Sequence, residues 1–112
     1  MRLLSLVLPV AVFVAFGGQP PATNKLTPET LADRIGCLDC HSVDKKKTGP
    51  AYRDVAARYK NDAGARVALT RKIKSGGKGN WTEITGGKAM PPHSALVSED
   101  EISQLVTWIL SR

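Results

Sequence analysis

The sequence predicts an all-α fold, a small domain of about four helices, and three observations favour it. Four segments repeat apolar residues at helical spacing, several of them with residues that favour helix starts or ends. No window alternates apolar and polar residues in the manner of a strand. A glycine- and proline-rich segment, residues 76–98, separates the last two helices, and so long a loop in a small domain usually has a functional reason.

The first predicted helix runs from Thr27 to about Ile35. Thr27 is a favourable N-cap, and Pro28 suits the first helical position. Leu31 and Ile35 share one face, and Gly36 ends the helix. We therefore expect a short amphipathic helix directly before the first cysteine.

The second predicted helix spans residues 52–59 and the third spans residues 62–75. Each repeats apolar residues on one helical face. These are Tyr52, Val55, Ala56 and Tyr59 in the second helix and Ala65, Leu69 and Ile73 in the third. The pair Gly76-Gly77 ends the third helix.

The last predicted helix has the clearest pattern. Ser98 and Glu101 have the spacing of a capping box, in which each side chain bonds to the other residue's backbone N–H. The stripe that we expect to be buried consists of Ile102, Leu105, Val106 and Ile109.

The N-terminal residues 1–17 have the order of a secretory signal peptide. A short basic start precedes 14 almost wholly apolar residues, 3–16, and small residues and prolines follow. A membrane-spanning helix needs about 20 apolar residues, so a retained membrane anchor is the less favoured alternative. We expect cleavage after Gly17, with Ala22 as the alternative site, and a mature domain over residues 25–112.

Composition limits the functions that this chain can have. The net charge of +6 is mildly basic, and aromatic residues do not interleave with basic ones as in a platform for single-stranded nucleic acid. We therefore expect no nucleic-acid partner, and no stable membrane insertion after cleavage. A domain of this size often needs a disulfide, a metal or a cofactor to stabilise it.

Residues 37–41, Cys-Leu-Asp-Cys-His, form the C-x-x-C-H pattern of c-type haem attachment. The thiols of Cys37 and Cys40 can each add to one vinyl group of a haem and form a thioether. His41 is then placed to donate an imidazole nitrogen to the iron. Attachment of this kind takes place outside the cytoplasm, which agrees with the predicted export. We expect one haem c with its iron as the cofactor.

Three other interpretations of the cysteine pair stay open. A redox disulfide of the thioredoxin kind lacks the expected β-α-β pattern here and leaves His41 without a role. Structural zinc needs further ligands, and His41 and His93 are the only histidines on offer. A structural disulfide between Cys37 and Cys40 would close a very short loop and stabilise the fold little.

Met90 is the predicted sixth ligand of the iron. It is the only methionine after the predicted signal peptide, and Pro91 and Pro92 stiffen the chain beside it. A thioether opposite an imidazole raises the reduction potential and fills the coordination site, which suits electron transfer. A methionine that merely fills the core is the alternative. His93 is a competing candidate ligand, which we instead expect to be a solvent-exposed loop histidine.

Five segments carry a resemblance to a known family. They are C-L-D-C-H at 37–41, T-G-P-A-Y-R-D-V-A-A-R-Y at 48–59, K-I-K-S-G-G-K-G-N-W at 72–81, A-M-P-P-H at 89–93 and the final T-W-I-L-S-R. Together they resemble the short bacterial branch of the class I cytochromes c, small soluble electron carriers. The resemblance implies the class I cytochrome c fold, with about four helices wrapped around one covalently bound haem.

The resemblance also implies roles for three residues outside the attachment motif. The carbonyl of Pro50 would accept a hydrogen bond from the second ring nitrogen of His41. The indole of Trp81 would hydrogen-bond a haem propionate, and Lys72 would serve the same propionate. One departure is the stretch T-E-I-T-G-G-K-A between Trp81 and Met90, which is slightly longer than expected for the shortest members.

The predicted function is one-electron transfer in the periplasm through a His41/Met90-ligated haem, and not enzymatic catalysis. The partners would be redox proteins with acidic docking surfaces, such as a terminal oxidase, a reductase or a dehydrogenase. The lysines at 45–47, with Lys78 and Lys88, would steer such partners to the haem edge, the alternative being an ordinary solvated surface.

Two alternatives to a free monomeric carrier stay open. The chain would otherwise be a dedicated haem subunit of a periplasmic oxidoreductase complex. The less favoured alternative is a ligand-binding or peroxidatic haem protein, which requires that Met90 be absent from the iron or readily displaced.

Overall fold

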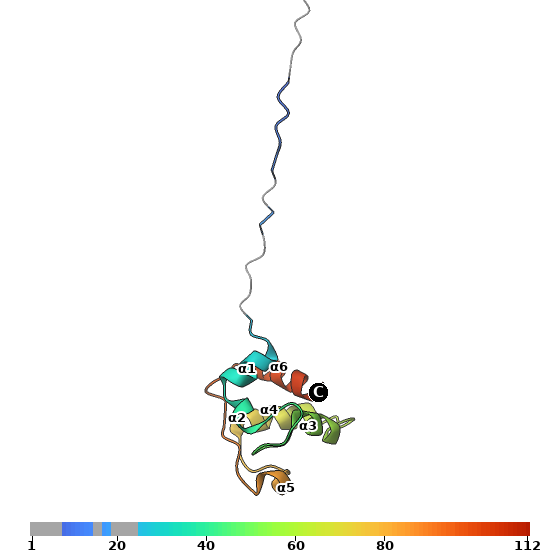
Figure 1. Cartoon of the computed structure of the whole chain (residues 1–112), viewed down its shortest axis with the longest axis vertical. Helices are drawn as coiled ribbons and strands as arrows, with labels where there is room; N and C mark the ends of the chain where they lie inside the picture. The colour runs from blue at the N-terminus through green and yellow to red at the C-terminus, as the bar shows by residue number, and fades with distance from the viewer. Residues whose placement is uncertain (1–7, 15–16, 19–24) are drawn as a thin grey trace, which may run out of the picture.

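The computed structural model describes residues 8–14, 17–18 and 25–112. This part of the chain contains helices and no strand, and its one strand-like pairing is an isolated bridge between Gly77 and Met90. The predicted all-α fold is therefore confirmed. The helices are α1 (Pro28–Arg34), α2 (Cys37–Cys40), α3 (Tyr52–Arg58), α4 (Ala65–Ser75), α5 (Thr82–Thr85) and α6 (Glu99–Leu110) (Figure 1).

Helix α6 is the central element of the domain, since α1, α3 and α4 all pack against it. Figure 1 shows α1 and α6 side by side, close to the point where the N-terminal segment joins the domain. The predicted stripe is buried, with Ile102, Leu105 and Val106 fully inside. The other buried members of this core are Leu31, Ala32, Cys37, Tyr52, Val55, Ile73, Val97 and Ile109.

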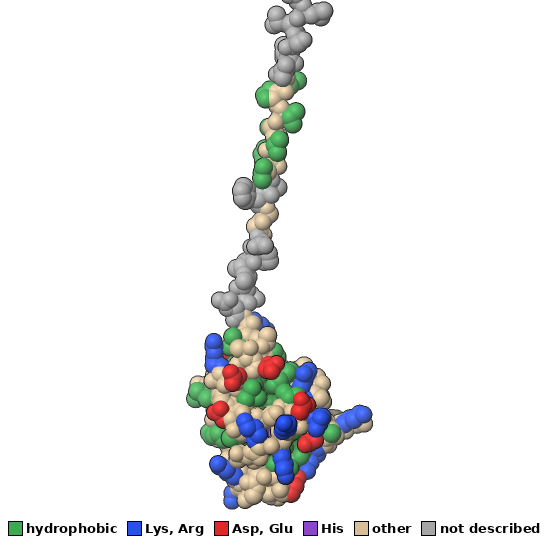
Figure 2. All heavy atoms as spheres, in the orientation of Figure 1, with side chains coloured by type: hydrophobic (Ala, Val, Ile, Leu, Met, Phe, Trp, Pro, Cys, Tyr) green, Lys and Arg blue, Asp and Glu red, His purple; other side chains and the backbone are tan. Residues whose placement is uncertain are grey.

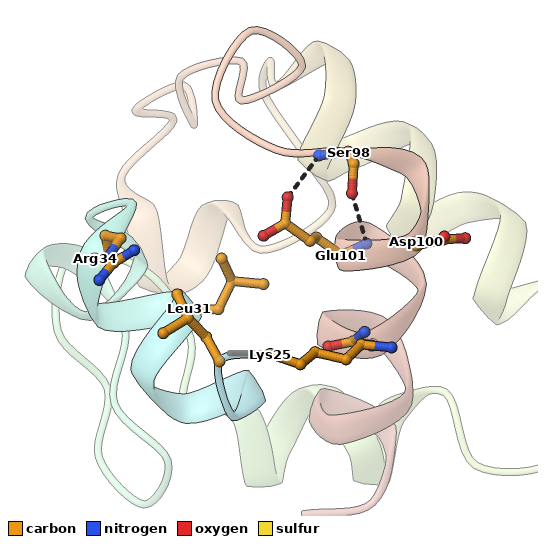
Figure 3. Close-up of a pocket in the computed structure, with 8 residues that line it drawn as sticks. Lys25, Leu31, Arg34, Ser98, Asp100 and Glu101 are labelled. Atoms are coloured by element: carbon orange, nitrogen blue, oxygen red, sulfur yellow. Dashed lines mark hydrogen bonds between the residues drawn. The ribbon is translucent and has the colours of Figure 1, made fainter. Parts of the chain in front are cut away.

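The predicted start signals of two helices are confirmed. The Ser98 hydroxyl accepts from the Glu101 backbone N–H at 3.2 Å, and the Glu101 carboxylate accepts from the Ser98 N–H at 3.0 Å (Figure 3). At α1 the Thr27 hydroxyl accepts from the Thr30 N–H at 3.2 Å, and Pro28 occupies the first helical position. Both caps satisfy backbone donors that a helix start leaves free.

The middle of the chain differs from the prediction in two ways. Helix α4 begins at Ala65 and not at Asp62, because the Asp62 carboxylate accepts from the Gly64 N–H at 2.8 Å and forms a turn ahead of the helix. Helices α2 and α5 are additions to the predicted set. Each has 4 residues, too few to repeat an apolar position at helical spacing.

The segment 76–98 is tied back to α4. Gly77 and Met90 exchange two backbone hydrogen bonds, of 2.8 and 3.1 Å, and the His93 N–H donates to the Ile73 carbonyl at 2.9 Å. These bonds close the segment into a loop. Its far part carries α5, at the end of the domain away from the N-terminal segment (Figure 1).

The described N-terminal residues do not contribute to the core. Residues 8–14 form no helix, and their apolar side chains are exposed (Figure 2). Residues 1–7, 15–16 and 19–24, with the alternative cleavage site Ala22, lie outside the described residues, so the signal peptide stays a prediction. Within the described part of the chain, no helix is long and apolar enough to cross a membrane.

Candidate haem site

Helix α2 presents the two cysteines. Gly36, in the left-handed conformation at φ 86°, separates α1 from α2, whose first and last residues are Cys37 and Cys40. Glycine adopts this φ at low cost, so the chain can turn directly ahead of the motif. Cys37 is buried, Cys40 is partly exposed, and both thiols are free. Two free thiols about one helical turn apart can react with the same small molecule.

The ring of His41 is fixed by its surroundings. Its Nδ1 lies 2.7 Å from the carbonyl oxygen of Pro50, and the ring stacks on Tyr52 with centroids 5.0 Å apart. Burial lowers the pKa of His41, the hydrogen bond with Pro50 opposes this, and the charge of His93 adds to the lowering. A neutral imidazole that donates from Nδ1 carries its lone pair on Nε2, which is the atom left to bind a metal.

Gly49 makes room for this ring. A Cβ on Gly49 would lie 2.5 Å from Cε1 of His41 and 2.9 Å from each ring nitrogen. No side chain therefore fits at this position unless the imidazole moves. The sequence analysis missed Gly49, whose only signal is its place in the T-G-P motif directly before Pro50.

The surroundings of Cys37 disfavour a thiolate. Burial raises the pKa of its thiol, and a hydrogen bond with Tyr52 opposes the shift only in part. A redox-active cysteine needs the opposite, a stabilised thiolate. Among the described residues, no group of at least 3 His, Cys, Asp or Glu side chains could hold a metal ion. These findings disfavour the thioredoxin-like and zinc interpretations of the pair.

Met90 is partly buried and packs against the hydrophobic core. Besides its backbone pairing with Gly77, it lies against Gly76, where a Cβ would collide with the Met90 carbonyl and lie 2.7 Å from the carbonyl carbon of Pro91. Gly76 also has a φ of 64°, in the left-handed region. The glycine pair predicted to end a helix therefore also determines where the Met90 backbone lies.

The expectation for His93 is wrong. Its side chain is not solvent-exposed: the residue is 6% exposed, and its buried Nδ1 has no hydrogen-bond partner. The backbone hydrogen bond to Ile73 draws the residue inward. A buried imidazole nitrogen without a partner in the protein chain is costly, so a water molecule or a bound group has to satisfy it. The interior near His41 and His93 is in this respect suited to a bound cofactor.

Trp81 and Lys72 lie on either side of the loop that follows α4. Trp81 is partly buried against the core, and the guanidinium carbon of Arg58 lies 3.4 Å from the centre of its ring. The Nζ of Lys72 lies 3.0 Å from the carbonyl oxygen of Lys78 and 3.4 Å from that of Gly76. Lys72 thus supports the loop from α4, and the propionate roles of both residues stay predictions.

The lysines expected to guide docking are surface residues. The Nζ of Lys47 donates to the carbonyl of Leu38 in α2 at 2.9 Å, so this lysine lies beside the cysteine motif. Figure 2 shows basic and acidic side chains interspersed over the visible face of the domain. The exposed lysines of the predicted set are Lys45, Lys46, Lys47, Lys78 and Lys88.

A surface hollow of about 380 Å³ lies elsewhere, where α1 meets the start of α6 (Figure 3). Both basic and acidic side chains line it, among them Lys25, Arg34 and Glu101. None of the predicted site residues contributes to its lining. The hollow is therefore separate from the candidate haem site.

A family model and individual relatives both assign this chain to the same family. A family model described as "Cytochrome c" matches residues 29–112. Cytochrome c-551 of Allochromatium vinosum is 43% identical over 97 residues, which cover 87% of this chain and 98% of the relative. Cytochrome c-551 of Pseudomonas aeruginosa is 45% identical over 85 residues, 76% of each chain.

Solved structures give the same fold. Cytochrome c552 of Nitrosomonas europaea aligns with a TM-score of 0.65 at 38% identity, over 74% of this chain and 96% of that one. The class 1 cytochrome MtoD of Sideroxydans lithotrophicus aligns with a TM-score of 0.66 at 34% identity, over 76% of this chain and 91% of that one.

Proposed function

Because the chain belongs to the cytochrome c family, and thus has one covalently attached haem c with its iron, we propose that it is a periplasmic electron carrier with His41 and Met90 as iron ligands. The contact between Nδ1 of His41 and the Pro50 carbonyl, at 2.7 Å, carries this proposal. It keeps the proton of the neutral ring on Nδ1 and so leaves Nε2 as the donor atom for iron. The bound group supplies one-electron chemistry, in which the iron alternates between ferric and ferrous states.

Cys37 and Cys40 attach the haem. Their thiols would hold the haem through two thioether bonds, one to each vinyl group. Their positions at the two ends of α2 support this role. Two covalent bonds would hold the group independently of the residues that bind its iron.

Met90 supplies the second axial ligand. Its thioether is a soft donor that favours ferrous iron and closes the iron to other ligands. The pairing with Gly77 and the crowding against Gly76 support this role, because they restrict the backbone on which the thioether is carried. With His41 and Met90 both bound to it, the iron would transfer electrons without binding substrate, which is why we propose a carrier and not an enzyme.

Trp81 and Lys72 serve the propionates in this proposal. The indole N–H would donate a hydrogen bond to a carboxylate, and the Lys72 ammonium would offset its charge. The support is their placement at the two ends of the loop that joins α4 to α5, with Lys72 in the last turn of α4 and Trp81 at the N-cap of α5, both partly buried. Charge compensation of this kind lowers the cost of keeping a carboxylate close to an apolar pocket.

The carrier would be exported and would meet redox partners with acidic surfaces. The apolar, exposed residues 8–14 support a signal peptide, since they do not pack onto the domain. The exposed lysines around Lys47, which contacts α2, support docking near the attachment site. Reversing the charge of the lysines at 45–47 would then slow electron transfer at low salt and not at high salt.

One preparation tests the proposed function. The full chain is expressed with export and haem-maturation machinery, the cell is fractionated, and haem that stays bound under denaturing conditions is measured. We expect covalent haem in the periplasmic fraction, none in the Cys37→Ala/Cys40→Ala variant, and no carbon monoxide binding by the reduced protein. Retention in the cytoplasm would contradict export. Ready binding of carbon monoxide would contradict Met90 ligation and favour the ligand-binding or peroxidatic alternative.

A further inference from the structure

Arg58, at the end of α3, reaches a segment that lies far along the chain. Its Nη1 donates to the carbonyl oxygen of Asn80 at 2.9 Å, and its Nη2 lies 2.6 Å from Oε1 of Glu83. Its guanidinium carbon lies 3.4 Å from the centre of the Trp81 ring. One side chain thus makes three kinds of contact with residues 80–83: a backbone hydrogen bond, an ion pair and a cation–π stack.

The segment that Arg58 holds connects two proposed haem contacts. Trp81 is the N-cap of α5, and residues 86–89 lead from α5 to Met90. Two glycines in this stretch, Gly86 and Gly87, have positive φ, so the chain between α5 and Met90 gains little stiffness from its own residues. This is also the stretch that is longer than expected for the family's shortest members.

Apart from the packing of Trp81 on the core, the other contacts that hold this segment are local hydrogen bonds. The amides of Ile84 and Thr85 both donate to the Trp81 carbonyl at 2.9 Å, and the Gly86 amide donates to Thr82 at 2.9 Å. Among the described residues, Arg58 is the only residue outside segment 80–89 that makes a hydrogen bond to it. A 4-residue helix is not stable by itself, so its external contact matters.

We propose that Arg58 is a positioning residue that holds Trp81 and α5 in place and thereby limits the opening of the chain that carries Met90. The inference rests on the proposed function, since it assumes Met90 as an iron ligand. Arg58 does not contact the proposed iron ligands; it acts through residues 80–83, to which it binds. The geometry favours the planar stack and the backbone hydrogen bond as the main contacts, because the Glu83 side chain is 54% exposed and exposed ion pairs contribute little.

This assignment is specific to arginine. A guanidinium is planar, so it can lie flat on an indole while its edge donates to both a carbonyl and a carboxylate. A lysine at position 58 keeps the charge and can still donate hydrogen bonds, but its ammonium lacks the planar fork and cannot stack on the indole. Arg58→Lys should therefore rescue the contact only in part.

The test is amide hydrogen exchange of the ferric haem-loaded protein, with Arg58→Ala, Arg58→Lys and a matched control. The control is Arg53→Ala, which removes an arginine from the same helix together with an exposed ion pair to Asp44. The reporting amides are those of Ile84, Thr85, Gly86 and Lys88, each of which has a backbone acceptor. The rate at which imidazole binds the ferric iron is measured in parallel, because entry of imidazole requires Met90 to leave.

For Arg58→Ala we expect about fivefold to tenfold faster exchange at the reporting amides and a similar rise in imidazole binding. Arg58→Lys should lie between it and the wild type, and Arg53→Ala should match the wild type. The amides of α6 should be unchanged in all three variants. That pattern requires local opening and not a loss of global stability.

Two results would overturn the inference. Exchange in Arg58→Ala equal to that in Arg53→Ala would make Arg58 an ordinary surface residue. Equal acceleration at the reporting amides and in α6 would assign Arg58 to global stability alone. Failure of the proposed function is seen separately: a wild-type protein that already binds carbon monoxide lacks Met90 ligation, and the amide exchange still decides whether Arg58 clasps the segment.

Discussion

The backbone of Gly49 lies directly against the imidazole ring of His41. A methyl group at this glycine would lie 2.5 Å from the ring, well inside van der Waals contact. The ring is at the same time bound to the carbonyl of the next residue, Pro50, and stacked on Tyr52. These three contacts leave the imidazole one orientation, with Nε2 as the free nitrogen.

Gly49→Ala should displace this ring. Overpacking of a buried site costs about 1–3 kcal/mol, and here the flexible partner is the proposed iron ligand itself. We expect a lower free energy of unfolding of the haem-loaded protein in denaturant and an altered visible spectrum. Gly79→Ala is the control, because its Cβ would meet only Lys72, at no less than 3.6 Å. Equal behaviour of the two variants would refute the close packing of Gly49 on His41.

Gly76 and Gly86 both have a positive φ, but they differ in ψ, which is −146° at Gly76 and 22° at Gly86, and in crowding. Their φ angles are 64° and 63°, but only a Cβ on Gly76 would meet neighbouring atoms, those of Met90 and Pro91 among them. Gly86→Ala should therefore cost about 1–2 kcal/mol, the penalty for a left-handed alanine. Gly76→Ala should cost more, about 3 kcal/mol or above, and should also disturb Met90 ligation. Denaturant unfolding of both variants measures the difference, and equal losses would mean that the Gly76 contact is unimportant.

Much of the fold follows from local sequence. The α6 stripe and its capping box are visible in the sequence because periodic burial and a terminal cap each leave a pattern within one helix. The haem motif is visible because Cys37, Cys40 and His41 are contiguous. Helices α2 and α5 are not visible, since their stability comes from what surrounds them and not from their own 4 residues.

The missed features of the site all depend on contacts between distant residues. His93 follows two prolines in a loop, which suggests exposure, yet its backbone bond to Ile73 buries it. The requirement for glycine at 49 comes from a ring eight positions earlier, and the contact of Arg58 with Glu83 spans 25 positions. Composition and residue spacing do not reveal such contacts between distant residues, so only the structure shows them.

The contacts of Arg58 with residues 80–83 should weaken at acidic pH. The hydrogen bond from Arg58 holds the pKa of Glu83 below its ordinary value of 4.5, so the ionised form is the one that favours the folded segment. A carboxyl group whose pKa is lowered in the folded state stabilises that state fully above pH 4.5. This stabilisation is lost as the pH falls through the lower pKa that the group has in the folded protein. Because the Glu83 side chain is exposed, the effect should be small and sensitive to salt.

Protection factors of the Ile84 and Thr85 amides measure this pH effect. In the wild type they should fall as the pH drops below 4.5, whereas in Glu83→Gln they should already be lower at neutral pH and vary less. A fall of the same size in Glu83→Gln would assign the acid response to another group.

Leu105 should be essential to the core. It is 1% exposed on α6, where α1, α3 and α4 converge, whereas Leu96 is 61% exposed. Leu105→Ala should lower the free energy of unfolding by about 2–5 kcal/mol, and Leu96→Ala should stay within about 0.5 kcal/mol of the wild type. Denaturant titration of the two variants measures this. Similar losses for both would contradict the central place of α6.

The axial ligands are tested most directly by the far-red absorption of the ferric protein, where sulfur-to-iron charge transfer gives a weak band. The account predicts this band in the wild type, its loss in Met90→Ala together with carbon monoxide binding after reduction, and its retention in Lys88→Ala, a nearby exposed control. A wild-type spectrum without the band, or a band that survives in Met90→Ala, would contradict ligation by Met90.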